Sequence, residues 1–261
     1  MIDEAFRRAK SERRAAFIPY VMAGDPDIAT TEILLDTLSA AGADVIELGV
    51  PYGDPLADGP SVAAAGARAL ASGTRLRDVL ALANRCRARC APLLLFTYFN
   101  PIDRFGVQRF ARECAAAGAA GAIVPDVALE ESEHLRSALG ANGLAMPLLV
   151  APSTPPERAA RIAEASTGFI YVVSRLGVTG ASRTPDLEPL ARQLRMLREL
   201  TDKPLAVGFG LGRAGDVRSV GSLADGVVVG SALIDAYAGS RGAEAARRVR
   251  EFVAPLIAAT A

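Results

Sequence analysis

Lysine and histidine are scarce in this chain of 261 residues. Lysine occurs only at Lys10 and Lys203 and histidine only at His134, so all the other basic residues are arginines. A lysine Schiff base needs a buried amine at the reacting end of a fold, but Lys10 falls in the charged N-terminal segment and Lys203 directly precedes an apolar run. Metal-assisted cleavage usually draws on histidine ligands, and His134 falls in a segment with helical spacing. We therefore expect neither a lysine Schiff base nor a metal site.

Long apolar runs, a one-sided charge and paired cysteines are also missing. No run reaches the ~18 uninterrupted apolar residues of a membrane span, and the N-terminus lacks the apolar core of a signal peptide, so we expect a cytoplasmic protein without membrane contact. The 29 basic and 29 acidic residues cancel, which argues against a nucleic-acid partner and favours a small-molecule ligand. Cys86, Cys90 and Cys114 are odd in number and lack zinc spacing, which fits reduced thiols.

Short apolar runs alternate with helical segments along the chain. The eight runs begin near Ala16, Asp44, Pro92, Gly121, Ala145, Phe169, Pro204 and Gly226. Strand–helix alternation repeated eight times in about 250 residues predicts an α/β fold, a (βα)8 TIM barrel, with residues 1–261 as a single domain. An added N-terminal helix is predicted at 3–14, an extra helical segment at 74–90 and a terminal helix at 241–260. A doubly wound open sheet shows the same alternation and is the structural alternative.

Glu47 stands inside the second apolar run, DVIELGV, just before the rigid loop PYGDPLADGP. Period-two alternation separates Glu47 from Ile46 and Leu48 and points it into the barrel mouth, where active sites of this fold lie. An unpartnered carboxyl there would have a raised pKa; the alternative is a structural ion pair with an arginine. Asp54 and Asp58 follow in the loop and complete a candidate acid/base set, although Asp58 could instead cap the next helix.

Glycine-rich turns follow the last three apolar runs: GVTGAS at 177–182, GFGLG at 208–212 and VVVGSAL at 227–233. Loops in this part of a barrel commonly hold phosphate through backbone N–H groups and a helix N-terminus. Three such turns together predict a phosphorylated small-molecule substrate. Because lysine and histidine are not available, the reaction must run on carboxylates, hydroxyls and backbone dipoles, and the substrate must supply its own electron sink.

Several motifs carry a resemblance to a known family. FIPYVMAGDP, ELGVPYGDPLADGP, TYFNPI, GFIYVVSRLGVTG and DGVVVGSALI follow one another in an order and spacing that closely resemble the tryptophan synthase alpha subunit. The match covers nearly the whole chain, and ELGVPYGDPLADGP is highly specific. The resemblance implies a lyase that cleaves indole-3-glycerol phosphate to indole and glyceraldehyde 3-phosphate in the last steps of tryptophan biosynthesis. Protonation of the indole ring at its C3 atom would create the required electron sink.

The resemblance also implies roles for individual residues. Glu47 is the acid/base that protonates the ring and accepts the side-chain hydroxyl proton, Asp58 accepts a hydrogen bond from the indole N–H, and Tyr171 lies close to the reacting side chain. The phosphate site is implied at Thr179, Gly180, Gly210, Gly230 and Ser231. The indole pocket is implied at Tyr20, Phe96, Tyr98, Ile123 and Phe209, each of which could equally be ordinary core. The long loop at 175–185 is expected to act as a mobile lid.

The partner implied by the resemblance is a beta subunit that receives indole, in an alpha–beta–beta–alpha heterotetramer. The implied cofactor, pyridoxal phosphate, belongs to that subunit, and this chain is expected to have no cofactor of its own. Residues that resemble the partner interface are Asp54, Asn100 and Asp126. The sequence departs from the family pattern at Gly53, at Gly212 and after Val127, where a proline is usual. Three alternatives stay open: a stand-alone lyase that releases indole, a mainly allosteric subunit, and another phosphate-binding barrel isomerase.

Overall fold

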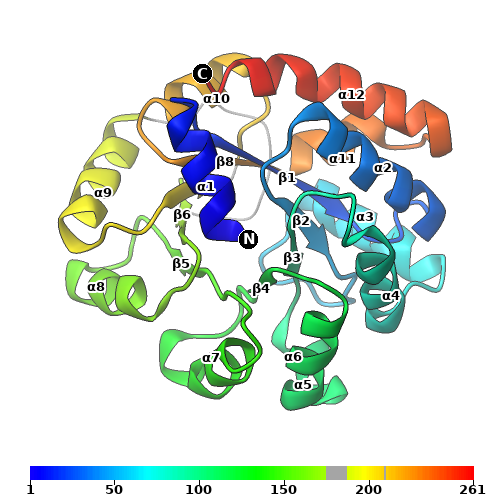
Figure 1. Cartoon of the computed structure of the whole chain (residues 1–261), viewed down its shortest axis with the longest axis horizontal. Helices are drawn as coiled ribbons and strands as arrows, with labels where there is room; N and C mark the ends of the chain where they lie inside the picture. The colour runs from blue at the N-terminus through cyan, green and yellow to red at the C-terminus, as the bar shows by residue number, and fades with distance from the viewer. Residues whose placement is uncertain (175–186, 209) are drawn as a thin grey trace.

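The computed structural model describes residues 1–174, 187–208 and 210–261, and its strands form the parallel sheet of a (βα)8 barrel (Figure 1). Within the described ranges the strand order is β4-β3-β2-β1-β8-β7-β6-β5, so β8 returns to pair with β1. The predicted barrel is confirmed, and the open-sheet alternative is wrong. The strands are β1 (Ala16–Met22), β2 (Ile46–Gly49), β3 (Leu93–Phe96), β4 (Gly121–Ile123), β5 (Leu148–Val150), β6 (Ile170–Val173), β7 (Leu205–Gly208) and β8 (Gly226–Val229).

The barrel closes at a narrow seam between β4 and β5. Gly121 and Ala145 form one parallel bridge, in which the Ala145 N–H donates to the Ala120 carbonyl at 3.0 Å. A Cβ at Gly121 would lie 2.1 Å from the Ala145 carbonyl oxygen, so only glycine fits there. The fifth strand was predicted from Ala145, but β5 begins three residues later because Pro147 has no N–H with which to continue the ladder.

Helices surround the strands, as Figure 1 shows. The helices of the described residues are α1 (Ile2–Ser11), α2 (Ile28–Ala41), α3 (Pro60–Ala71), α4 (Leu76–Cys86), α5 (Phe99–Phe105), α6 (Val107–Ala116), the 3-10 turn η1 (Leu129–Glu131), α7 (Glu133–Gly140), α8 (Pro156–Ala165), α9 (Leu187–Leu200), α10 (Ala214–Gly221), α11 (Ser231–Tyr237) and α12 (Gly242–Ala258). The predicted N-terminal, extra and terminal helices correspond to α1, α4 and α12. Helix α5, which begins within the TYFNPI motif, was not predicted.

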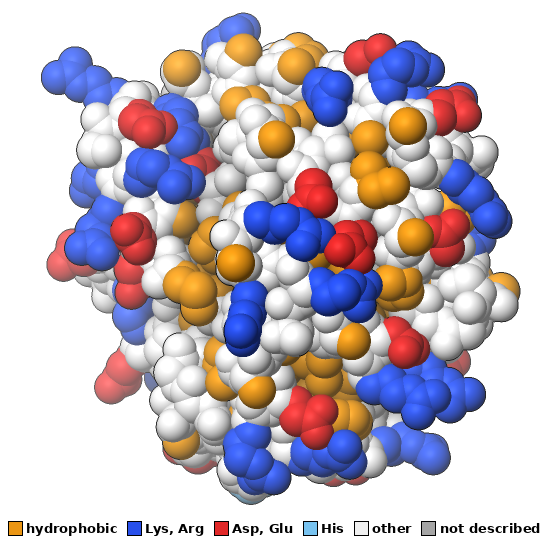
Figure 2. Space-filling view, turned by 45° about the vertical axis from the view of Figure 1, so that its right-hand side comes forward, with side chains coloured by type: hydrophobic (Ala, Val, Ile, Leu, Met, Phe, Trp, Pro, Cys, Tyr) orange, Lys and Arg blue, Asp and Glu red, His pale blue; other side chains and the backbone are white. Residues whose placement is uncertain are grey.

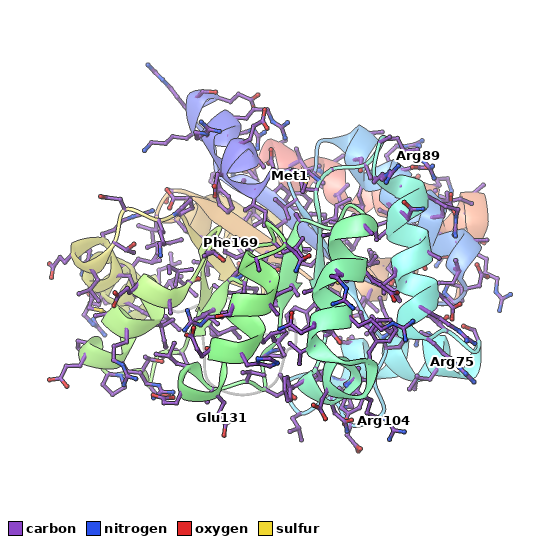
Figure 3. The ribbon with its side chains drawn as sticks, turned by 60° about the horizontal axis from the view of Figure 1, so that its bottom comes forward. Met1, Arg75, Arg89, Arg104, Glu131 and Phe169 are labelled. Atoms are coloured by element: carbon purple, nitrogen blue, oxygen red, sulfur yellow. The ribbon has the colours of Figure 1, made fainter. Side chains whose placement is uncertain are left out.

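Helix α1 covers the N-terminal end of the barrel. Its apolar face is buried, and the Phe6 ring packs against Phe169, which directly precedes β6, with the ring centroids 5.5 Å apart. A Cβ at Gly226 would lie 3.0 Å from the Phe6 ring, so the glycine at the start of β8 lets this ring approach the barrel floor. In Figure 3, α1 and Met1 lie at one end of the molecule and Arg104 and Glu131 lie at the other. The loops that follow the strands are therefore left uncovered by α1.

A buried ion-pair cluster fastens this N-terminal end. Asp44 is fully buried and accepts hydrogen bonds from Arg14 at 2.6 and 2.9 Å, from Arg8 at 2.9 Å and from the Phe17 N–H at 2.8 Å. Burial raises the pKa of Asp44, but these bonds outweigh it and leave the pKa below its usual value. Each oxygen of this carboxylate is thus satisfied, and the cluster ties α1 to the start of β2.

The outer surface carries charges of both signs. Over the face in Figure 2, basic and acidic side chains are interspersed. Elsewhere in the chain, Arg89, in the turn after α4, pairs with Glu32 and Asp36 on α2. Within the described ranges, no helix is long and apolar enough to cross a membrane and no cluster of side chains has the composition of a metal site. The three cysteines are free; Cys86 and Cys114 are buried and Cys90 is partly exposed.

Candidate active site

A cavity opens at the end of the barrel opposite α1. The empty space in and in front of it, open solvent included, is about 540 Å3. Among the residues described, it is lined by Tyr20, Glu47, Ala57, Asp58, Val62, Phe96, Tyr171, Gly210, Leu211, Val228, Gly230, Ser231 and Ala232. This lining contains two carboxyl groups and no lysine, arginine or histidine, so its acid/base chemistry depends on the carboxyls.

Glu47 lies on β2, in register with Tyr20 on β1 and Leu94 on β3. Its side chain points into the cavity as the alternation predicted, and the residue is 1% exposed. Within the described part of the chain it forms no ion pair, and its Oε1 atom has no hydrogen-bond partner. The ion-pair alternative is therefore wrong. Because burial disfavours the charged carboxylate, the pKa of Glu47 rises to about 8, and the group is mostly protonated at neutral pH.

Asp58 lies at the end of the loop between β2 and α3 and is only partly buried. Its Oδ1 atom accepts a hydrogen bond from the Tyr98 hydroxyl at 2.8 Å. Burial raises the pKa of Asp58 to about 6, although the bond from Tyr98 lowers it. Helix α3 begins at Pro60, and Gly59 occupies its N-cap position without a side-chain cap. Asp58 is therefore not the helix cap that the sequence also allowed.

Three aromatic side chains form much of the cavity wall. Tyr20 and Phe96 meet edge to face with ring centroids 5.7 Å apart, and Tyr171 contributes from β6. A Cβ at Gly49 would lie 2.1 Å from the Tyr20 hydroxyl oxygen, and a Cβ at Gly208 would lie 2.3 Å from that of Tyr171. These two glycines give both hydroxyls room inside the barrel. Sequence reasoning missed their role, although each glycine ends a strand beside a bulky inward-facing neighbour.

The opposite wall consists of the turns after β7 and β8. Gly210, with a left-handed φ of 90°, follows β7. Gly230 and Ser231 lie where β8 leads into α11, which begins at Ser231. The first N–H groups of a helix have no partner within it, so this wall can present backbone donors to an anion. Thr179, Gly180, Phe209 and the expected lid at 175–185 lie outside the described residues.

Two residues expected in the indole pocket are not part of the described lining. Tyr98 lies behind Asp58, to which it is hydrogen-bonded, and Ile123 is fully buried at the end of β4. The sequence reasoning also missed five lining residues: Ala57, Val62, Leu211, Val228 and Ala232. Alternation along β8 could have identified Val228, whereas the others depend on how loops and helices fold over the barrel mouth.

The three residues expected at a partner interface are all exposed on this side of the protein. Asn100 Nδ2 donates to the Tyr52 hydroxyl at 3.0 Å, and the Asp126 carboxylate accepts from the Phe99 N–H at 2.9 Å. Asp54 lies in the β2–α3 loop beside Leu56, which is 79% exposed.

This fold and this cavity together define a class: (βα)8-barrel enzymes whose chemistry rests on buried carboxyl groups at the mouth of the barrel. The comparisons identify the family within that class. The family model described as "Tryptophan synthase alpha chain" matches residues 6–260. Tryptophan synthase alpha chains from Picosynechococcus sp. and Arabidopsis thaliana are 49% and 44% identical, each over 96% of this chain and over 96% and 92% of their own lengths.

Solved structures agree with the sequence comparisons. Tryptophan synthase from Mycobacterium tuberculosis matches with a TM-score of 0.92 at 37% identity, covering 99% of this chain and 97% of that one. The tryptophan synthase subunit alpha of Legionella pneumophila matches with a TM-score of 0.89 at 32% identity, covering 99% and 97%. The chain belongs to the tryptophan synthase alpha chain family. It is a lyase of tryptophan biosynthesis that cleaves indole-3-glycerol phosphate to indole and glyceraldehyde 3-phosphate.

Proposed function

We propose that Glu47 and Asp58 carry this cleavage, with Glu47 as the acid/base and Asp58 as the acceptor for the indole N–H. The observation that supports this most is the buried, unpartnered carboxyl of Glu47 in the cavity. Leaving such a group unpaired costs stability, and a pKa of about 8 suits a group that must give and take a proton near neutral pH.

The proposed sequence of steps begins with protonated Glu47. It delivers its proton to the ring carbon C3, which converts the indole to a cationic indolenine. The negative charge of Asp58 stabilises the positive charge that develops at the ring nitrogen. The Glu47 carboxylate then accepts the proton of the side-chain hydroxyl next to the ring, the carbon–carbon bond breaks, and its electrons return to the ring. Indole and glyceraldehyde 3-phosphate are released, and Glu47 is protonated again. Tyr171 lies beside the reacting side chain.

The substrate's phosphate is proposed to lie against the turns that contain Gly210, Gly230 and Ser231, with Thr179 and Gly180 contributing from the loop after β6. None of the described residues that line the cavity is a lysine or an arginine, so backbone N–H groups of these turns and the Ser231 hydroxyl are the donors proposed for the phosphate. The indole ring is then placed among Tyr20, Phe96 and Phe209, with Tyr98 and Ile123 behind this first layer of side chains.

The partner in this family is the beta subunit, and pyridoxal phosphate belongs to that subunit. We propose that this chain docks through the exposed surface that carries Asp54, Asn100 and Asp126, in an alpha–beta–beta–alpha heterotetramer. Three free thiols support a reducing compartment, the cytoplasm.

The roles of the two carboxyls can be tested by solving the structure with an indole-propanol phosphate, an analogue that lacks the reacting hydroxyls. We expect Glu47 beside ring carbon C3, an Asp58 oxygen within hydrogen-bond distance of the ring N–H, and the phosphate held mainly by backbone N–H groups. A phosphate contacted chiefly by arginine side chains elsewhere would contradict the placement. Turnover with and without a beta subunit then separates a partner-dependent lyase, which is strongly activated, from a stand-alone lyase.

A further inference from the structure

Tyr98 lies directly behind Asp58. It follows β3, occupies the N-cap position of α5 and is 3% exposed. Its side chain is not among the cavity-lining residues, so it does not reach the substrate space directly. It does contact the candidate catalytic loop, and these contacts determine how Asp58 is presented.

The Tyr98 hydroxyl makes two hydrogen bonds to adjacent residues of that loop. It accepts from the Ala57 N–H at 3.1 Å and donates to Asp58 Oδ1 at 2.8 Å, and both distances are those of well-formed hydrogen bonds. A phenol has one proton, so acceptance from Ala57 leaves that proton for Asp58. One hydroxyl therefore fixes both the backbone before Asp58 and one oxygen of its carboxylate.

The Tyr98 ring is itself held from outside. It lies against the Tyr52 ring with centroids 5.4 Å apart, and the Tyr52 hydroxyl accepts a hydrogen bond from Asn100 Nδ2 at 3.0 Å. The adjacent N–H of Phe99 donates to the Asp126 carboxylate at 2.9 Å. These contacts place the phenol before substrate arrives, which reduces the ordering that binding would otherwise require.

Within the described ranges, Asp58 has one further attachment through its own backbone N–H. The Asp58 N–H donates to the Pro55 carbonyl at 3.2 Å within the loop itself, while Asp54 and Leu56 are exposed. Asp58 Oδ2 makes no hydrogen bond within the described ranges. The bond from Tyr98 thus occupies one carboxylate oxygen and leaves the other available.

We propose that Tyr98 is a positioning residue for the cleavage: its hydroxyl holds Asp58 Oδ1 so that Oδ2 is presented to the indole N–H. This inference rests on the proposed role of Asp58. Removing the hydroxyl should let the carboxyl rotate and should remove a donor that favours its ionised form.

The titratable groups around Asp58 predict how loss of the Tyr98 hydroxyl shifts the pH profile of kcat/KM. The titratable groups that line the same cavity are Glu47 on β2, Tyr20 on β1 and Tyr171 on β6. Tyr98 bonds Asp58 from behind. No basic side chain lines this cavity in the described part of the chain, so the phenol of Tyr98 is the donor that offsets the burial of Asp58. Without it, the pKa of Asp58 rises above about 6, and the acidic limb of the kcat/KM profile moves to higher pH.

The test is a double-mutant cycle with Tyr98→Phe and Asp58→Asn, measured as indole formation across pH in complex with the beta subunit. We expect Tyr98→Phe to lower kcat about 10-fold, with a smaller change in KM, and to move the acidic limb up by about one pH unit, the effect of losing one hydrogen bond to a charged group. In the Asp58→Asn background the same substitution should change kcat less than twofold.

The matched control is Tyr237→Phe, which removes another buried tyrosine hydroxyl, on α11 and outside the cavity lining. It should leave kcat and the pH profile unchanged. Equal effects of Tyr98→Phe in both Asp58 backgrounds, or an unmoved acidic limb, would overturn the inference while leaving the role of Asp58 intact. If Asp58→Asn alone retained full activity, the proposed role of Asp58 itself would be wrong. The same cycle distinguishes this result from a failure of the Tyr98 inference alone.

Discussion

Asp44 and Glu47 lie three residues apart in the chain, and both are almost fully buried, with exposures of 0% and 1%. Asp44 lies near the closed end of the barrel, where two arginines and a backbone N–H satisfy it and lower its pKa. Glu47 lies at the open end, where Oε1 has no described partner and burial raises its pKa to about 8. Burial alone therefore does not determine the state of a carboxyl group; its hydrogen-bond partners decide.

We propose that the two residues have different tasks: Asp44, just before β2, stabilises the fold, and Glu47, on β2, serves the reaction. A paired carboxylate contributes to folding and is fixed in one protonation state, whereas an unpaired one costs stability and can exchange a proton at neutral pH. This division matches the general organisation of the barrel, in which one end serves stability and the other carries the active site.

The largest effect is expected from Glu47→Gln. Loss of a general acid/base lowers turnover by about two to four orders of magnitude, because glutamine keeps the shape but cannot transfer the proton. Indole formation with the beta subunit present measures this, and circular dichroism checks the fold. Stability should stay equal or increase, since an uncompensated acid is replaced by a neutral amide. Near-normal turnover of a folded variant would remove Glu47 from the mechanism.

The opposite result is expected for Asp44 at the closed end of the barrel, where substitution should lower stability and leave turnover unchanged. Asp44→Asn leaves Arg14, whose side chain is only 17% exposed, without its charged partner, and should reduce the free energy of unfolding by about 3 kcal/mol. At a temperature where the variant is folded, kcat should change little because the cavity is not touched. Urea unfolding and steady-state kinetics on the same preparation give both values. A large fall in kcat with unchanged stability would show that Asp44 serves the reaction and does not stabilise the fold.

The pH dependence of stability should differ between wild type and Glu47→Gln. The pKa of Glu47 is about 8 in the folded protein and 4.5 as its ordinary value, so between these values the folded state holds a proton that the unfolded state has released. Wild-type stability should therefore fall relative to the variant as pH rises through this window, by up to about 1.4 kcal/mol per pH unit. Asp44, with its lowered pKa, contributes stability that is lost toward acidic pH instead. Parallel stability curves for the two proteins would contradict a raised pKa.

A smaller effect is expected at Lys203, which also serves structure. Its Nζ donates to the carbonyls of Ala163, Glu164 and Ser166 at 2.7, 2.9 and 2.7 Å, around the end of α8. Lys203→Met should lower the free energy of unfolding by about 1–2 kcal/mol without changing kcat. Lys10→Met, on the exposed side of α1, is the control and should change neither. Loss of turnover in folded Lys203→Met would contradict the expectation that no lysine takes part in the reaction.

The sequence was informative where local patterns determine structure. Apolar runs locate all eight strands, and the alternation in DVIELGV places Glu47 inside the barrel. It was less informative where distant segments meet. Three features depend on neighbours 24 to 40 residues away: the seam at Gly121, the room that Gly49 and Gly208 give to tyrosines, and the position of Tyr98 behind Asp58. No local pattern encodes such a contact.

The most direct test of the contrast between Asp44 and Glu47 is the titration of the Glu47 carboxyl in the folded protein. Carbon-13 NMR of protein labelled at the glutamate carboxyl carbon, with the resonance assigned by its loss in Glu47→Gln, reports the protonation state of this group alone. The account predicts a midpoint near pH 8, with Asp44, labelled in the same way, staying ionised to below its usual pKa. A Glu47 midpoint near 4.5 would show that the carboxyl is charged at neutral pH and would contradict the account.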